Sequence, residues 1–368
     1  MQYKPFGNTG IMMSRLGFGA MRLPMTDDGK HVDYDLALQI IHRAFELGVN
    51  YIDTAYGYCN GTSEIAVGKS LKGWRDRVYV STKCPMWHVS QKSDYRRFLE
   101  EQLRKLDVDY IDFYHFHSLN QEAWRKKVLG LDLLEEAAKA KEEGLIKHCS
   151  FSFHDRPEVM KEIIDSGVMT SLLCQYNLLD RRNEEMMAYA ASKGMAVCVM
   201  GPVGGGRLAY PSEVITSLAS GSRSTPETAL RFVFANPNVN VALSGMNTIE
   251  MVEENARVAS LAEPLTPQEK EAIEETLKRT KELADLYCTG CEYCMPCPHG
   301  VNIPENFKIM NYHRVWGLTD YARSLYNKLG EAKAEECQEC GTCEPQCPQK
   351  IPIIEQLKEV ARTFGPNN

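Results

Sequence analysis

The sequence lacks the long apolar runs, the positive charge and the leader pattern that mark several common classes of protein. No stretch of 18 or more apolar residues occurs, so we expect no transmembrane helix. A net charge of −7 argues against a nucleic-acid partner, because binding to phosphate backbones needs clustered positive charge. The opening residues MQYKPFGNTG show neither the apolar core nor the cleavage site of a signal peptide, so we expect a cytoplasmic protein.

The 13 cysteines fall into two groups. A reducing compartment does not maintain structural disulfides, so all of them are expected to be thiols or ligands. Five are scattered, as is usual for small buried apolar side chains: Cys59, Cys84, Cys149, Cys174 and Cys198. The other eight lie close together beyond residue 287, which indicates ligands.

These eight cysteines form two closely spaced runs. The first run comprises Cys288, Cys291, Cys294 and Cys297, followed by Pro298. The second comprises Cys337, Cys340, Cys343 and Cys347, followed by Pro348. The second spacing matches bacterial ferredoxins, in which three thiolates hold one cubane and the fourth reaches the other cluster. The first run is one residue shorter before its last cysteine.

Structural zinc is the alternative for such cysteines. Zinc sites usually take two pairs of ligands a dozen or more residues apart, which four cysteines in so short a span do not provide. We therefore predict two [4Fe–4S] clusters with crosswise ligation. One cluster is expected to use Cys288, Cys291, Cys294 and Cys347, and the other Cys337, Cys340, Cys343 and Cys297.

From about residue 35 to residue 260, short β-rich runs alternate with helical patterns. With an early run added, the β-rich runs are 17–21, 51–53, 78–83, 110–116, 147–153, 171–176, 195–200 and 239–243. The helical patterns include 93–105, 129–142, 158–165, 184–193 and 225–235. Strands that alternate with helices pair in parallel, and eight such units in about 260 residues fit a closed barrel. The predicted fold class is α/β, a (β/α)₈ barrel.

The barrel is expected to end before the cysteine runs. Thr266, Pro267 and Glu269 form a capping box with proline at the first helical position, which predicts a helix up to those runs. Residues 302–330, between the runs, carry apolar residues at helical spacings. We therefore predict a barrel domain at 1–284 and a small, mostly helical ferredoxin-like domain at 285–368.

Four reactive residues fall at or just after predicted barrel strands, where barrel enzymes carry their active sites. They are Asp53, Tyr58, Lys83 and His117. Taken singly, each has an ordinary interpretation, such as a helix cap or a solvated charge. Taken together, they predict a site in which Asp53 pairs with Lys83, and positive Lys83 lowers the pKa of the Tyr58 phenol. A neutral His117 would then orient a substrate carbonyl while the phenol exchanges the proton.

The same residues lie in motifs that resemble those of the aldo-keto reductase family. The similar segments are NYIDTAYGY (50–58), SEIAVGKSL (63–71), STK (81–83) and DYIDFYHFH (109–117), within a likeness that spans about residues 3–260. Position by position, the catalytic tetrad of the family falls on Asp53, Tyr58, Lys83 and His117. The family spacing selects Tyr58 over Tyr56, and His117 over His115.

The resemblance implies a nicotinamide cofactor, NAD(H) or NADP(H), at the mouth of the barrel. Ser152 and Gln175 match the residues that hold the carboxamide, with Asn177 nearby. The stretch GPVGGGRL (201–208) matches the loop over the pyrophosphate and contributes Gly201, Gly204, Gly205 and Arg207. Glu254 and Asn255 match the pair that contacts the adenine. This glycine run is not GxGxxG, so a Rossmann fold is not indicated.

The sequence departs from NADPH-preferring family members where those members bind the ribose 2′-phosphate. Such members carry Lys or Arg at positions that here hold Gly245, Asn247, Thr248 and Met251. A phosphate needs a guanidinium or an ammonium partner, so we expect NADH to bind at least as well as NADPH. Arg207 or Arg257 would restore a preference for NADPH if either reached the ribose.

Three functions compete for these features. The first is a carbonyl reductase or alcohol dehydrogenase with a small-molecule substrate, and the complete tetrad favours it. The second is a cofactor-binding sensor with little turnover, and the third is an electron relay with an electron-transfer protein as partner. Nicotinamide gives two electrons as hydride, whereas each cubane passes one, and no flavin motif bridges them. The clusters are therefore structural, oxygen-sensing or single-electron carriers.

Overall fold

The computed structural model describes residues 1–285, 288, 292–347 and 351–365, which form two compact units. The barrel unit comprises Met1–Gly205 and Ala229–Pro264, and the second unit comprises Gly206–Thr228 and Leu265–Asn368. The helix before the cysteine runs, α10 (Pro267–Asp285), is grouped with the second unit. The predicted domain limits of 1–284 and 285–368 stay a prediction.

Eight parallel strands close a barrel within the described residues, which confirms the predicted fold class. Around the barrel the strand order is β10-β3-β4-β5-β6-β7-β8-β9. The strands are β3 (Leu16–Gly19), β4 (Tyr51–Asp53), β5 (Tyr79–Cys84), β6 (Ile111–Leu119), β7 (Ile146–Phe153), β8 (Ser171–Gln175), β9 (Ala196–Met200) and β10 (Val241–Ser244). Each of them overlaps one of the predicted β-rich runs.

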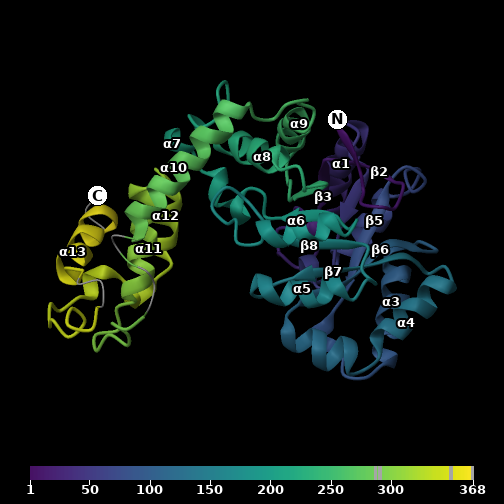
Figure 1. The fold of residues 1–368 in the computed structure, drawn as a ribbon, viewed down its shortest axis with the longest axis horizontal. Coiled ribbons are helices and arrows are strands. Elements are labelled where there is room, and N and C mark those ends of the chain that lie inside the picture. Colours follow the sequence, from purple (N-terminus) through teal and green to yellow (C-terminus); the bar gives the residue numbers. More distant parts are fainter. Residues whose placement is uncertain (286–287, 289–291, 348–350, 366–368) are drawn as a thin grey trace. The chain divides into compact units, whose positions relative to one another are not determined.

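Helices follow the strands and cover the outside of the barrel (Figure 1). They are α1 (Tyr34–Glu46), α2 (Ser63–Ser70), α3 (Ser93–Leu106), α4 (Leu133–Glu142), α5 (Pro157–Asp165), α6 (Glu184–Ser192), α8 (Thr225–Ala235, in this unit from Ala229) and α9 (Ile249–Val258), with a π-helical turn, η4 (Ala123–Leu129), before α4. The start of α1 shows how sequence sets the boundaries, because the Asp33 carboxylate accepts the Leu36 N–H at 3.1 Å.

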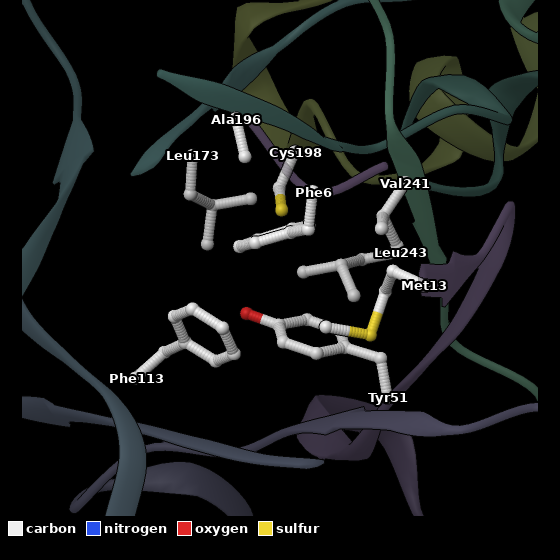
Figure 2. Packing of buried hydrophobic residues seen from close by; sticks show 9 residues of the cluster. All are labelled: Phe6, Met13, Tyr51, Phe113, Leu173, Ala196, Cys198, Val241 and Leu243. Carbon is white, nitrogen blue, oxygen red and sulfur yellow. The ribbon is translucent and has the colours of Figure 1, made fainter. Parts of the chain in front are cut away.

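An antiparallel hairpin that the sequence patterns did not predict closes the N-terminal end of the barrel. Its strands are β1 (Tyr3–Pro5) and β2 (Met12–Ser14). Phe6 and Met13 of this hairpin are fully buried and pack among Tyr51, Phe113 and Val241 (Figure 2). Tyr51 and Val241 are the first residues of β4 and β10, so this core lies at the end opposite to the carboxyl ends of the strands.

The described part of the second unit consists mainly of helices and loops. Its helices are α7 (Glu213–Thr216), α10 (Pro267–Asp285), α11 (Ile303–Arg314), α12 (Thr319–Asn327) and α13 (Ile353–Phe364). The predicted capping box is confirmed, because Thr266 Oγ1 accepts the Glu269 N–H at 3.2 Å and the Glu269 carboxylate accepts the Thr266 N–H at 2.7 Å. Among the described helices, none has the length and the apolar character needed to cross a bilayer.

A buried histidine makes the stability of the barrel depend on pH. His115 on β6 is fully buried and pairs in register with Lys83. Burial, followed by the charge of Lys83, lowers the pKa of His115 to about 3, although a backbone contact at Phe151 opposes this shift. Below about pH 6.5 the unfolded chain therefore binds a proton that the folded barrel does not. The free energy of unfolding should fall as the pH falls from about 6.5 towards 3.

His115→Leu should reduce this loss of stability, by up to about 1.4 kcal/mol for each pH unit below the unfolded pKa. The measurement is urea unfolding, followed by circular dichroism, at several pH values between about 7.5 and 5. The matched control is His31→Leu, which replaces an exposed histidine between β3 and α1. A pH dependence that is the same in His115→Leu and in the unaltered protein would contradict the prediction.

Candidate functional site

The four tetrad residues lie at or just beyond the carboxyl ends of neighbouring strands. Asp53 ends β4, Lys83 is the second-last residue of β5, and His117 lies in β6. Tyr58 begins the short helix η2 (Tyr58–Gly61). Lys83 Nζ donates to Asp53 Oδ1 at 2.5 Å and to the Thr54 carbonyl oxygen at 2.7 Å. Lys83 is 1% exposed and Asp53 4% exposed. The structure therefore brings the expected pair together in the interior of the barrel.

Lys83 is the charged centre of this arrangement. Burial opposes its charge, but Asp53 and Tyr58 outweigh burial, so the pKa of Lys83 is raised. The second oxygen of Asp53 accepts the Ser81 hydroxyl at 2.8 Å, which fixes the carboxylate on both sides. Lys83 Nζ lies 4.9 Å from the centroid of the Tyr58 ring. A fixed ammonium group is thus held beside the phenol at neutral pH.

The pKa of the Tyr58 phenol is raised, and the sequence-based prediction of a lowered pKa was wrong. Burial is the largest cause, Lys83 lowers the pKa as expected, and Asp53 raises it again. The prediction considered the neighbouring cation and left out the removal of the phenol from water. Because its pKa is raised, the phenol is protonated at neutral pH and has a proton to donate.

His117 is held as a neutral imidazole near the phenol. Burial, then the charges of Lys83, His115 and His154, lower the pKa of His117 to about 2. Its ring centroid lies 6.1 Å from that of Tyr58, with the two rings at 82°. The register between β6 and β7 shifts after Phe116, which redirects the chain at His117. A protonated phenol and a neutral imidazole therefore lie together, as the binding of one carbonyl oxygen requires.

A left-handed turn fixes the backbone directly after Tyr58. Cys59 and Asn60 have φ values of 51° and 56°, a conformation that costs about 1–2 kcal/mol for most residues. Thr62 Oγ1 donates to the Cys59 carbonyl oxygen at 2.6 Å, and Asn60 Nδ2 donates to that of Gly29 at 2.9 Å. The sequence analysis missed this turn, although the pair Asn60–Gly61 is a typical turn signal.

The residues expected at the nicotinamide carboxamide lie on adjacent strand ends. Ser152 lies in β7, and its hydroxyl accepts the Ser118 N–H at 2.7 Å. Gln175 ends β8, and a Cβ on Gly201 would lie 2.5 Å from Gln175 Nε2. Gly201 also has a φ of 62°, and its carbonyl oxygen accepts Asn177 Nδ2 at 3.0 Å. Only glycine at position 201 leaves the Gln175 amide in place, so these residues fit a small polar group at the mouth.

The remaining residues expected at the cofactor lie in the loop after β9 and on α9. Gly204 and Gly205 begin the short helix η5 (Gly204–Ala209), which also contains Arg207. Gly204 and Gly205 belong to the barrel unit, and Arg207 belongs to the second unit. On α9 Asn255 is buried, and its Nδ2 donates to the Ser244 hydroxyl at 3.1 Å, while neighbouring Glu254 is half-buried. Asn255 thus ties α9 to the end of β10.

Arg22 was missed by the sequence analysis. It ends the short helix η1 (Ala20–Arg22) after the first barrel strand, and its Nη2 donates to the Gly205 carbonyl oxygen at 2.9 Å. Its Cβ, Cγ and Cδ pass 3.6–3.8 Å from the position that a Cβ would take on Gly245. An exposed cation therefore lies between the loops after β9 and β10. The available signal was its position after a barrel strand, where functional residues collect.

Four of the eight candidate cluster ligands line one small cavity in the second unit. They are Cys297, Cys337, Cys340 and Cys343. Ile303, Ile354 and Leu357 contribute apolar side chains to the same cavity. The first of these cysteines comes from the first run, and the other three come from the second run. The candidate ligand Cys291 lies outside the described residues, whereas Cys288, Cys294 and Cys347 are half-buried.

The donor set of this cavity fits a cubane better than a single metal ion. Among the described residues, no three His, Cys, Asp or Glu side chains form a group that could hold one ion. A [4Fe–4S] cluster takes four thiolates, each on a different iron, so its ligands stand around a cluster-sized space. A structural zinc ion instead needs its ligands to converge on one centre.

Two protein-family models match the barrel and the cysteine-rich part of the chain. Residues 15–278 match the model of the aldo/keto reductase family, and residues 287–351 match that of the 4Fe-4S dicluster domain. An uncharacterized oxidoreductase, YqkF, of Bacillus subtilis is 28% identical over 316 residues, covering 76% of this chain and 97% of the relative. The L-galactose dehydrogenase of Arabidopsis thaliana is 26% identical over 310 residues, covering 76% and 96%.

A solved structure shows the same likeness in three dimensions. The holo form of aldo-keto reductase AKR11C1 from Bacillus halodurans is 29% identical, with a TM-score of 0.64 over 75% of this chain and 96% of the other. The matched family segment includes the strands that carry Asp53, Lys83 and His117. Since the family model covers more than half of its residues, this chain belongs to the aldo/keto reductase family, with a 4Fe-4S dicluster domain after its barrel.

Proposed function

We propose that the barrel transfers hydride between a nicotinamide cofactor and the carbonyl or alcohol group of a small molecule, with Asp53, Tyr58, Lys83 and His117 as its catalytic residues. The family makes the chain an NAD(P)-dependent oxidoreductase. The observation that carries the tetrad assignment is the buried ion pair between Lys83 and Asp53, 2.5 Å long and beside the Tyr58 ring. Burying two charges in a barrel interior costs desolvation free energy, and such buried charged groups are concentrated at functional sites.

Each residue has one part in this reaction. When bound, the reduced nicotinamide supplies the hydride to the carbonyl carbon. Tyr58 donates its proton to the carbonyl oxygen, so that one hydride and one proton convert the carbonyl into an alcohol. Lys83 stabilises the phenolate that remains, and Asp53 keeps Lys83 in place. His117, held neutral, donates an N–H to the same oxygen and orients the substrate.

We assign the cofactor contacts along the same mouth. Ser152 and Gln175 would hold the carboxamide. The Gln175 amide has room in its position because Gly201 has no side chain, since a Cβ there would lie 2.5 Å from Gln175 Nε2. The loop that contains Gly201, Gly204, Gly205 and Arg207 would cover the pyrophosphate, and Glu254 and Asn255 would contact the adenine. We also assign Arg22 to the cofactor contacts, because its guanidinium donates to the carbonyl oxygen of Gly205, in the loop that would cover the pyrophosphate.

We propose further that the dicluster domain holds two [4Fe–4S] clusters with crosswise ligation. The cavity that Cys297 shares with Cys337, Cys340 and Cys343 supports this arrangement, since its four cysteines come from both runs. The other cluster would then use Cys288, Cys291, Cys294 and Cys347. Each cubane exchanges one electron at a time, so an electron-transfer protein is the expected partner of this domain.

Tyr58→Phe should lower carbonyl reduction by about 10²–10⁴-fold while cofactor binding stays nearly unchanged, because only the proton donor is removed. The measurement is nicotinamide oxidation over a panel of carbonyl compounds, together with a fluorescence titration of the cofactor. The matched control is Tyr56→Phe, which removes a hydroxyl that contacts Glu101 at 3.4 Å. Activity of Tyr58→Phe within about threefold of the unaltered protein would reject Tyr58 as the proton donor.

Anaerobically purified protein should contain about eight irons per chain, four for each cubane. With crosswise ligation, Cys297→Ala and Cys340→Ala should perturb the same cluster signal in electron paramagnetic resonance, and Cys347→Ala the other one. Cys59→Ala, outside the two runs, is the control that should perturb neither. A Cys297→Ala spectrum that resembles Cys294→Ala would mean that each run holds its own cluster, and colourless protein with zinc would reject the clusters altogether.

Arg22→Met should weaken the binding of NADH and of NADPH to a similar extent. The expected loss of affinity is about ten- to a hundredfold, which corresponds to the loss of one charge-assisted hydrogen bond. Both cofactors carry the pyrophosphate, and we expect NADH to bind the unaltered protein at least as well as NADPH. Fluorescence titrations of both cofactors measure this, with Arg77→Met as a control outside the mouth. A tenfold or larger advantage of NADPH, abolished by Arg22→Met, would instead place Arg22 at the 2′-phosphate.

A further inference from the structure

One sulfur in the cavity of Cys297, Cys337, Cys340 and Cys343 has a hydroxyl partner. Cys340 Sγ and Thr342 Oγ1 lie 3.4 Å apart, within hydrogen-bonding distance for sulfur. Of the cysteines in the two runs that the structure describes, Cys340 is also the exposed one. The outermost candidate ligand of this cluster is therefore the one that contacts a neutral hydrogen-bond donor.

The direction of this hydrogen bond follows from the chemistry of a cluster ligand. A cysteine that binds iron is a thiolate and has no proton to give, so the hydroxyl of Thr342 must donate and Cys340 Sγ must accept. Gly341 allows the approach, because its φ of 74° turns the chain between the two residues.

The two runs differ at this position. The residue two places after the second cysteine of the run is Thr342 in the second run, after Cys340, and Tyr293 in the first run, after Cys291. Tyr293 is 67% exposed. At this position a short hydroxyl side chain occurs in the second run and not in the first, so replacing Thr342 is expected to affect one cluster only.

We propose that Thr342 raises the reduction potential of the cluster held by Cys297, Cys337, Cys340 and Cys343 by donating a hydrogen bond from its hydroxyl group to the Cys340 thiolate. This inference rests on the proposed assignment of that cluster. A [4Fe–4S] cluster that gains one electron becomes more negative by one charge, part of which resides on its sulfur ligands. A hydrogen-bond donor at a ligand sulfur therefore stabilises the reduced state more than the oxidised state. Thr342 is a tuning residue and takes no part in the hydride transfer of the barrel.

The test is a redox titration of the full chain, purified anaerobically and monitored by electron paramagnetic resonance. Thr342→Val keeps the shape of the side chain and removes the hydroxyl, whereas Thr342→Ser keeps the hydroxyl and is the matched control. Thr342→Val should move the midpoint potential of one cluster to a more negative value and leave the other cluster unchanged. Thr342→Ser should leave both unchanged, with the iron content equal in all three proteins.

Equal potentials in Thr342→Val and the unaltered protein, or equal shifts in the valine and serine variants, would overturn the role of Thr342 and leave the cluster assignment intact. If Thr342→Val loses iron, the proposal is tested on the unaltered protein by measuring the protons coupled to its reduced cluster. Its reduced cluster should show a coupled proton that exchanges rapidly in deuterium oxide, and the absence of this proton would overturn the proposal. Protein that binds zinc and no iron–sulfur cluster would reject the assignment and the inference together.

Discussion

The ion pair between Lys83 and Asp53 is the interaction on which the rest of the active site depends. Two charges that are almost removed from water are tolerated because they are 2.5 Å apart and because Ser81 and the Thr54 carbonyl oxygen take up further hydrogen bonds. Removing one partner from such a pair typically costs about 3–5 kcal/mol. The charge of Lys83 also acts on its neighbours, because it opposes the raised pKa of Tyr58 and helps to keep His117 neutral.

The strands and the tetrad could be predicted from the sequence because their signals are local. A buried parallel strand is a short apolar run, and the reactive residues stand at the ends of such runs, so order along the chain gave their place in the barrel. The hairpin around Phe6 gave no such signal, since strands of three residues are too short to show a period. The spacing of the cysteines was equally local, whereas the cavity that joins Cys297 to the second run required the fold.

What the sequence could not supply depends on contacts between distant residues. Arg22 meets the Gly205 carbonyl oxygen across 183 positions of the chain, a distance at which no spacing rule applies. The net pKa of Tyr58 was wrong for a related reason, because burial is a property of the folded barrel and the neighbouring charge alone could be guessed. Sequence patterns therefore identified the reactive groups, and the fold determined their protonation states.

The hairpin at the N-terminal end of the barrel has a consequence for synthesis on the ribosome. Phe6 and Met13 are translated more than 200 residues before Val241 and Leu243 of β10, against which they pack. Lys4 Nζ likewise donates to the Pro237 carbonyl oxygen at 2.7 Å. The nascent chain must therefore keep these apolar side chains without their final partners until most of the barrel has been translated. Contacts of such long range slow folding, because they form only after the segments between them have been translated and brought together.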